Sequence, residues 1–266
     1  MKKRVISACI ILAVLIPLII IGKEPFEIFC VVMALCSMHE LIRVRKNKKD
    51  FPVILKIFAY LLVAFLTMNN AGSADFNYSI DYKVMSFIIF AFFLPMIFVN
   101  DHKKYNLNDV LFLVGSTLFL GLSYNLLMIV RNNDITYIIY LLLITFVTDT
   151  FAYFSGMLIG SHKLAPNISP KKTIEGLCGG VVVGTLVATV YYHMIINPNF
   201  GVLPLIGITL LLCIIGQLGD LCFSAIKRSY NVKDFSNLLP GHGGILDRFD
   251  SLVFVLLAFV LFIEIL

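Results

Sequence analysis

The sequence predicts an all-α integral membrane protein, a polytopic bundle of about nine transmembrane helices with its N-terminus in the cytoplasm. The first observation is composition: 59% of the 266 residues are hydrophobic and only 14% are charged, whereas a soluble domain is about 45–50% apolar and about 25% charged. The second is that the apolar residues form long unbroken blocks, as membrane-crossing helices require. The third is that the basic residues are concentrated in alternate connections between those blocks.

Nine apolar blocks can be drawn as membrane spans. Helices are expected throughout, because within lipid every backbone polar group has to be satisfied inside its own segment. A transmembrane barrel would instead show alternating strands of about ten residues, and the sequence lacks that pattern. The nine predicted spans are 5–21, 26–42, 53–68, 84–100, 109–130, 135–158, 175–196, 203–224 and 249–266.

The Lys and Arg residues set the predicted orientation. With the N-terminus inside, 18 of the 21 Lys and Arg residues fall on the cytoplasmic side, which is the asymmetry that membrane proteins show. The outer side then holds Lys23, Lys83 and Arg131, and the odd number of spans leaves Leu266 outside. The expected location is the cell membrane, with the long polar connections on the cytoplasmic face.

The chain is interpreted as one transmembrane domain, 1–266, with N-terminal helices over 1–134 and catalytic helices and cytoplasmic loops over 135–266. The first apolar block has the basic start of a signal peptide but no small-x-small cleavage site, so we expect it to remain as a helix. Two cytoplasmic loops, 159–174 and 225–248, are rich in Gly, Pro, Ser and Lys, which is typical of turns.

Acidic residues inside or beside the apolar blocks are the first sign of a site, because a carboxylate within a membrane is costly and usually functional. Asp149, Asp220, Asp247 and Asp250 all fall toward the cytoplasmic half of the predicted bundle. Structural readings stay open: Asp247 and Asp250 would suit the N-terminus of a helix, and Asp149 or Asp220 could pair with a basic residue. Glu40 and Asp109 lie at the inner ends of their spans, and we expect both at the membrane interface.

The loop 225–248 adds basic residues and glycines to these acids. Lys227, Arg228, Lys233 and Arg248 can bind phosphate by charge and hydrogen bonds, and glycine allows backbone N–H groups to approach an anion. Facing carboxylates repel one another unless a cation lies between them, and Mg²⁺ commonly takes one or two carboxylates together with substrate phosphates. The pattern therefore predicts a metal and phosphate site at the membrane surface.

The motifs in this part of the chain resemble those of the phosphatidate cytidylyltransferases, also called CDP-diacylglycerol synthases. The downstream motif is Ser224-x-x-Lys227-Arg228, Lys233-Asp234, Leu239-Pro240-x-His242-Gly243-Gly244 and Asp247-Arg248-Phe249-Asp250. The upstream motif is Asp149-Thr150-x-Ala152-Tyr153-x-x-Gly156 with Lys163-Leu164-x-Pro166-x-x-Ser169-Pro170-Lys171-Lys172-Thr173-x-Glu175-Gly176. The resemblance covers about 145–250 in detail, and the first five spans share only their hydrophobicity.

The resemblance implies a nucleotidyltransferase of phospholipid biosynthesis that converts CTP and phosphatidate to CDP-diacylglycerol and pyrophosphate. It also implies Mg²⁺ dependence, with K⁺ as a candidate second ion, a homodimer within membrane lipids and no nucleic acid partner. The expected metal ligands are Asp220, Asp247, Asp149 and Asp250. The expected catalytic residues are Asp220, Asp247, Lys227, Arg228, Asp250 and His242. The expected substrate-binding residues are Lys171, Lys172, Ser169, Ser224, Lys233, Gly243, Gly244 and Arg248.

Two other classes of protein stay open at this point. A cation-coupled membrane transporter would also carry acids and helix-breaking glycines within its spans, although the sequence shows no inverted repeat and its acids lie toward one side. A non-catalytic scaffold related to the enzyme would be expected to have lost motif residues, and none is lost between Ser224 and Asp250.

Overall fold

The computed structural model describes residues 13–69, 71–73, 82–99, 104–239, 241, 243–263 and 265. Within these residues the chain is almost entirely helical, with one two-stranded sheet. It divides into two compact units. The first unit is Met1–Asn133 with Asp234–Leu246, and the second unit is Asp134–Lys233 with Asp247–Leu266.

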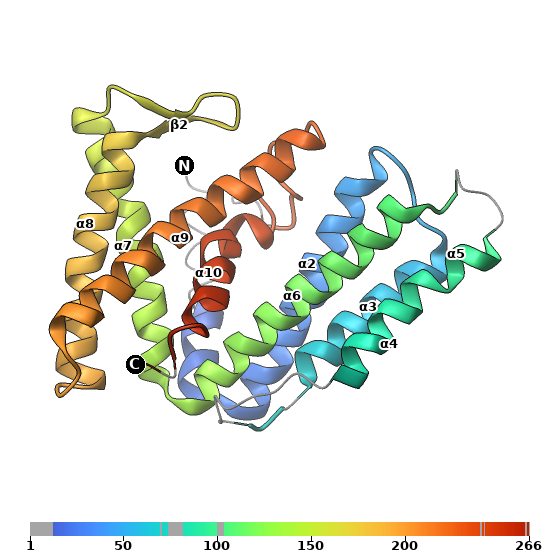
Figure 1. Ribbon diagram of the computed structural model, residues 1–266, viewed down its shortest axis with the longest axis horizontal. Coiled ribbons are helices and arrows are strands. Elements are labelled where there is room, and N and C mark those ends of the chain that lie inside the picture. The colour runs from blue at the N-terminus through green and yellow to red at the C-terminus, as the bar shows by residue number, and fades with distance from the viewer. Residues whose placement is uncertain are drawn as a thin grey trace. The chain divides into compact units, whose positions relative to one another are not determined.

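The first unit is a helical bundle (Figure 1). Its elements are a helix over 13–21, α2 (Lys23–Lys46), α3 (Val53–Met68), α4 (Tyr82–Phe93), α5 (Pro95–Phe98) and α6 (Leu107–Asn133). The core contacts of α6 include a buried hydrogen bond of 2.7 Å between the hydroxyls of Ser37 and Tyr124. The backbone of α6 also comes close to α3 at Gly121, where a Cβ atom would lie 2.7 Å from Leu66 Cδ2.

An ion-pair cluster fixes the basic end of this unit. The Asp109 side chain is fully buried. It accepts hydrogen bonds from Arg45 Nη2 at 2.7 Å and from the Asn106 backbone N–H at 3.0 Å, and it forms an ion pair with Lys49. The Arg45 guanidinium also lies over the Phe112 ring. Asp109 therefore lies in the first turn of α6, and protein groups enclose its side chain completely, which the sequence did not predict.

The second unit contains the other helices and the sheet. Its elements are α7 (Ile135–Ile159), β1 (Lys163–Ala165), β2 (Ser169–Thr173), α8 (Ile174–Tyr191), the π-helical turn η1 (Tyr192–Ile196), α9 (Val202–Ser229) and α10 (Leu246–Phe259). The first residue of α10, Leu246, still belongs to the first unit. The strands form an antiparallel hairpin that lies at one end of α7 and α8 (Figure 1).

Small residues allow α7 and α8 to pack with their backbones close together. Gly176, Gly180 and Gly184 recur every fourth residue, so they share one face of α8. A Cβ atom at Gly180 would lie 2.5 Å from the Thr148 carbonyl oxygen, and one at Gly176 would lie 2.8 Å from the Ala152 carbonyl oxygen. Close backbone contact through small residues is a common way to associate helices in lipid.

Glycines also join α9 to α10. A Cβ atom at Gly216 would lie 2.9 Å from Val255 Cγ2, and one at Gly219 would lie 2.7 Å from Phe254 Cβ. Glycine at these two positions therefore lets α9 and α10 approach closely. Because Asp220 directly follows Gly219, this packing places the Asp220 carboxylate beside the start of α10.

The apolar blocks correspond to helices. Within the described residues, five helical segments are long and apolar enough to cross a membrane: Lys23–Lys46, Leu107–Asn133, Ile135–Ile159, Ile174–Ile196 and Val202–Ser229. Val53–Met68 and Tyr82–Phe98 are shorter apolar helical segments, the second interrupted at Leu94, just before Pro95. Each of the nine predicted spans contains helix. The chain is therefore a multi-pass, all-α membrane protein.

Two connections differ from their predicted form. The loop 159–174 was expected to contain turns, and it holds the hairpin, whose base is closed by Thr173 as the N-cap of α8 and by Glu175. The Glu175 carboxylate accepts hydrogen bonds from Ser161 and His162. The loop predicted over 225–248 begins later, because α9 continues to Ser229 and carries Lys227 and Arg228 on its last turn.

Candidate active site

One face of α9 carries a polar stripe. Gln217, Asp220, Ser224 and Lys227 follow one another at intervals of three or four residues, and this spacing places side chains above one another on a helix. Glycines precede Asp220 on the neighbouring face and admit α10. The spacing of these residues therefore places the polar groups on one face of α9, and the glycines bring α10 close to that face.

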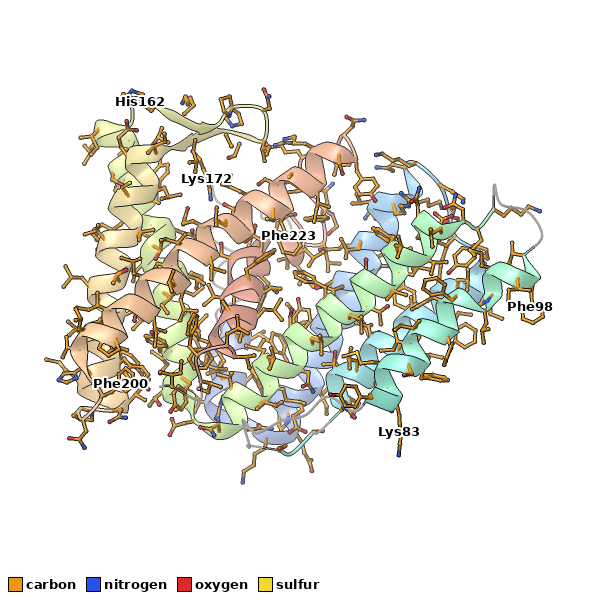
Figure 2. All side chains as sticks on the ribbon, viewed as in Figure 1. Lys83, Phe98, His162, Lys172, Phe200 and Phe223 are labelled. Carbon is orange, nitrogen blue, oxygen red and sulfur yellow. The ribbon has the colours of Figure 1, made fainter. Side chains whose placement is uncertain are left out.

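The hairpin supplies a lysine to this stripe. Lys172 extends from β2 toward α9 (Figure 2). Its Nζ atom lies 2.7 Å from Asp220 Oδ2 and 3.1 Å from Gln217 Oε1. The side chains of Lys172 and Asp220 are 21% and 28% exposed, so this ion pair is open enough for a ligand to reach it.

Asp149 enters the same network from α7. Gln217 donates a hydrogen bond of 2.5 Å from Nε2 to Asp149 Oδ1, while its Oε1 atom accepts from Lys172. The amide therefore links a carboxylate on α7 to a lysine on β2, with one donor and one acceptor used. Gln217 was not among the predicted site residues, although its spacing from Asp220 was a signal that could have identified it.

The first turns of α10 complete the cluster. Asp247 Oδ1 lies 2.7 Å from Lys227 Nζ, and the two side chains are only 4% and 10% exposed. Asp250 lies one turn further along α10, in contact with Asp220, and accepts the Ser251 N–H at 2.9 Å. Two predicted metal ligands thus differ: Asp247 is enclosed with a lysine, whereas Asp250 faces another carboxylate.

The electrostatics of the cluster favour bound cations. Asp149, Asp220 and Asp250 act on one another as neighbouring negative charges, and like charges held together destabilise the ionised state unless a cation is near. Among the described residues, no three Asp, Glu, His or Cys side chains are placed to hold one ion together. The adjacent pair of Asp220 and Asp250 still offers hard oxygen donors of the kind that Mg²⁺ shares with substrate phosphates.

Arg228 and Ser224 lie at the edge of this cluster. Arg228 donates from Nη1 to the Val232 carbonyl oxygen at 2.9 Å and from Nε to the Ile168 carbonyl oxygen at 3.3 Å. These bonds fasten the end of α9 to the hairpin loop while the guanidinium stays exposed. Ser224 Oγ donates to Asp220 Oδ1 at 3.4 Å, a long contact that orients the carboxylate weakly.

The other predicted substrate-binding residues with side chains surround the same region at the surface. Ser169 and Lys171 lie on β2, Lys233 follows α9, and Arg248 lies on the first turn of α10. Lys171, Lys233 and Arg248 are exposed, and Ser169 is half-buried. Their positions leave long cationic side chains able to meet a polyanion from solution.

The glycine motif belongs to the first unit. Gly243 and Leu239 exchange two backbone hydrogen bonds of 2.9 and 3.1 Å, so the Gly243 N–H, expected to bind phosphate, already has a partner. Gly241 and Gly243 adopt φ angles of 80° and 86°, which favour glycine. Gly244 is buried in the same segment. His242, predicted as a catalytic residue, and Pro240 lie outside the described residues.

Comparison with known proteins gives one consistent result. The sequence model of the cytidylyltransferase family matches residues 2–266. The phosphatidate cytidylyltransferase of Bacillus subtilis (strain 168) is 35% identical over 261 residues, which cover 96% of this chain and 95% of the relative. The phosphatidate cytidylyltransferases of Staphylococcus haemolyticus and Staphylococcus aureus (strain COL) are each 36% identical over 257 residues, with 96% of both chains covered.

Proposed function

The chain belongs to the cytidylyltransferase family, and we propose that it is a phosphatidate cytidylyltransferase of phospholipid biosynthesis. It transfers the cytidylyl group of CTP to phosphatidate and releases pyrophosphate. The observation that carries this assignment beyond family membership is the contact of Asp220 with both Lys172 and Asp250. A cluster of acids and lysines on motif residues suits a reaction between two polyanions.

The reaction needs positioning more than acid–base chemistry. A phosphate oxygen of phosphatidate attacks the α-phosphorus of CTP and forms a new P–O bond. The bond from that phosphorus to the bridging oxygen breaks, and its electron pair leaves with pyrophosphate. Because the attacking oxygen is already anionic near neutral pH, the main barrier is the repulsion between the substrates and the charge on the leaving group.

The residues of the second unit divide between two tasks. Lys172, Lys227 and Arg228 offset phosphate charge, together with the exposed cations Lys171, Lys233 and Arg248. Asp220 and Asp250, with Asp149 and Asp247 beside them, would hold Mg²⁺, and K⁺ is a candidate for a second position. A bound Mg²⁺ would supply Lewis-acid stabilisation of phosphoryl oxygens. Gln217 keeps Asp149 and Lys172 oriented.

The membrane arrangement is also part of the proposal. Nine crossings with the N-terminus inside place the active site on the cytoplasmic face of the cell membrane, where CTP is available, while the acyl chains stay among the lipids. Lys and Arg side chains form ion pairs within each unit: Arg45 and Lys49 meet Asp109 in the first unit, and Lys172 and Lys227 meet acids in the second. A homodimer is the expected assembly, and no nucleic acid takes part.

A direct assay tests the function. Purified protein in lipid nanodiscs is supplied with CTP, Mg²⁺ and phosphatidate, and CDP-diacylglycerol and pyrophosphate are measured. We expect the two products in equal amounts, and none when diacylglycerol, which lacks the phosphate, replaces phosphatidate. A folded sample that forms no product would contradict the proposal. The comparisons lend no support to a cation-coupled transporter, which would instead show ion flux in proteoliposomes without nucleotide.

A further inference from the structure

Glu40, on α2, accepts hydrogen bonds from the segment that leads into α10. The sequence predicted a residue at the membrane interface here, and the structure adds that protein groups bury it, since Glu40 is only 1% exposed. A buried carboxylate is costly unless hydrogen bonds satisfy it. Its hydrogen-bond donors in the described part of the chain come from the segment 236–246, about two hundred residues away.

The Glu40 carboxylate contacts both ends of that segment. At the start, Ser236 Oγ donates to Glu40 Oε1 at 2.6 Å. At the end, the Ile245 N–H donates to Oε1 at 2.8 Å and the Leu246 N–H donates to Oε2 at 2.9 Å. One side chain thus joins the two ends of the segment through both of its oxygens. We call this carboxylate and its three donors the clasp.

The backbone at Gly244 lies against the Glu40 carboxylate. A Cβ atom at Gly244 would lie 2.5 Å from Glu40 Oε1 and 2.6 Å from Oε2, so the carboxylate occupies the space that any side chain would need. The Leu239 and Gly243 backbone bonds close the inner turn. The glycine at 244 is therefore explained by contact with Glu40.

The clasp also fixes the start of α10. Leu246 is the first residue of that helix, and the first N–H groups of a helix have no partners within it. A carboxylate at this end satisfies such groups and interacts favourably with the helix dipole. The next residue along the chain is Asp247, and Asp250 follows on the same first turns.

We propose that Glu40 is a positioning residue for catalysis: its hydrogen bonds to the N–H groups of Ile245 and Leu246 fix the start of α10 and so orient Asp247, the next residue along the chain. The inference rests on the proposed function for its kinetic consequence. The ordering itself does not depend on which reaction is catalysed.

The test compares Glu40→Gln with Glu27→Gln by hydrogen exchange and by kinetics. Glu27 is a matched control because it lies on the same helix and accepts hydrogen bonds from the Gly72 N–H and Asn132 Nδ2. A glutamine at 40 has one acceptor oxygen and cannot receive donors on both sides. We expect amide exchange at 245 and 246 to rise at least about 10-fold, and kcat to fall about 10- to 100-fold, the scale for losing a supporting hydrogen-bond partner.

Further variants separate positioning from simple loss of stability. Glu40→Asp, which keeps both oxygens on a shorter side chain, should recover part of kcat, whereas Glu27→Gln should match the wild type in both measurements. Wild-type exchange at 245 and 246 in Glu40→Gln would overturn the inference, as would faster exchange spread evenly over α2 and α6. If the exchange result holds and CDP-diacylglycerol is formed by neither wild type nor variant, the proposed function fails while the clasp stands.

Discussion

The two units each contain a cluster of acidic and basic side chains, and the clusters have opposite charge balance. In the first unit, Asp109 is enclosed by Arg45 and Lys49, so a single carboxylate meets two cations. In the second unit, the contacts around Asp220 and Lys227 join four carboxylates with two lysines.

The difference separates a structural ion pair from a candidate site. Asp109 is fully buried and saturated with donors, so a further cation would find no free negative charge there. Asp220 is 28% exposed on its side chain, and another carboxylate contacts it. Net negative charge that remains accessible attracts Mg²⁺ and, through the metal, phosphate. Charge balance, more than the presence of acids, identifies the site.

The largest effect is expected from removing the Asp220 charge. Asp220→Asn keeps the size of the side chain but takes away a carboxylate that is central to the cluster. We expect turnover of CTP and phosphatidate to fall at least about 10²-fold, the scale for losing one preorganised electrostatic contact, with unchanged membrane insertion. The control is Asp134→Asn, which alters the N-cap of α7 and should leave turnover near wild type. Wild-type turnover in Asp220→Asn would remove that residue from the site.

A smaller effect is expected from Lys172→Met. This change keeps most of the apolar stem and removes the positive charge between Asp220 and Gln217. Phosphate then meets a more negative cluster, so we expect kcat/KM for CTP to fall about 10-fold while the Mg²⁺ concentration needed for half-maximal activity decreases. Steady-state kinetics over a range of Mg²⁺ measures both. Lys163→Met, at the exposed first residue of β1, is the control, and equal behaviour of the two variants would show that Lys172 has no special role.

The smallest effect on turnover is expected from Asp109→Asn. Breaking a buried ion pair costs about 3 kcal/mol of stability, so the thermal unfolding temperature in detergent should fall. The kcat of the folded fraction should stay at the wild-type value, because the charge lost belongs to the saturated cluster. A loss of kcat as large as that of Asp220→Asn, at equal folded concentration, would erase the distinction between the two clusters.

Hydrophobicity and charge predicted much of this arrangement. Each of the nine apolar blocks contains helix, and the acids within or beside those blocks indicated where a site would form. The motif residues Lys172, Asp220, Lys227 and Asp247 do come together in the second unit. These features could be predicted because span length, spacing on one helix face and motif order depend only on residues that are close together in the sequence.

The remaining features depend on contacts between distant residues. Glu40 and Asp109 look interfacial from their places at the ends of apolar blocks, yet their partners lie far away along the chain: Ser236 for Glu40 and Arg45 for Asp109. The hairpin strands are too short to show an alternating pattern. The role of Gln217 became visible only once α7, β2 and α9 were placed together.

Binding of Mn²⁺, a paramagnetic substitute for Mg²⁺, tests the charge-balance account most directly. The wild type, Asp220→Asn and Asp109→Asn are compared in nanodiscs with CTP present, and bound Mn²⁺ is counted by electron paramagnetic resonance. We expect the wild type and Asp109→Asn to bind Mn²⁺ with the same affinity and Asp220→Asn to lose at least about 10-fold in affinity. Wild-type affinity in Asp220→Asn, or equal losses in both variants, would contradict the assignment of the metal to the second unit's acidic cluster.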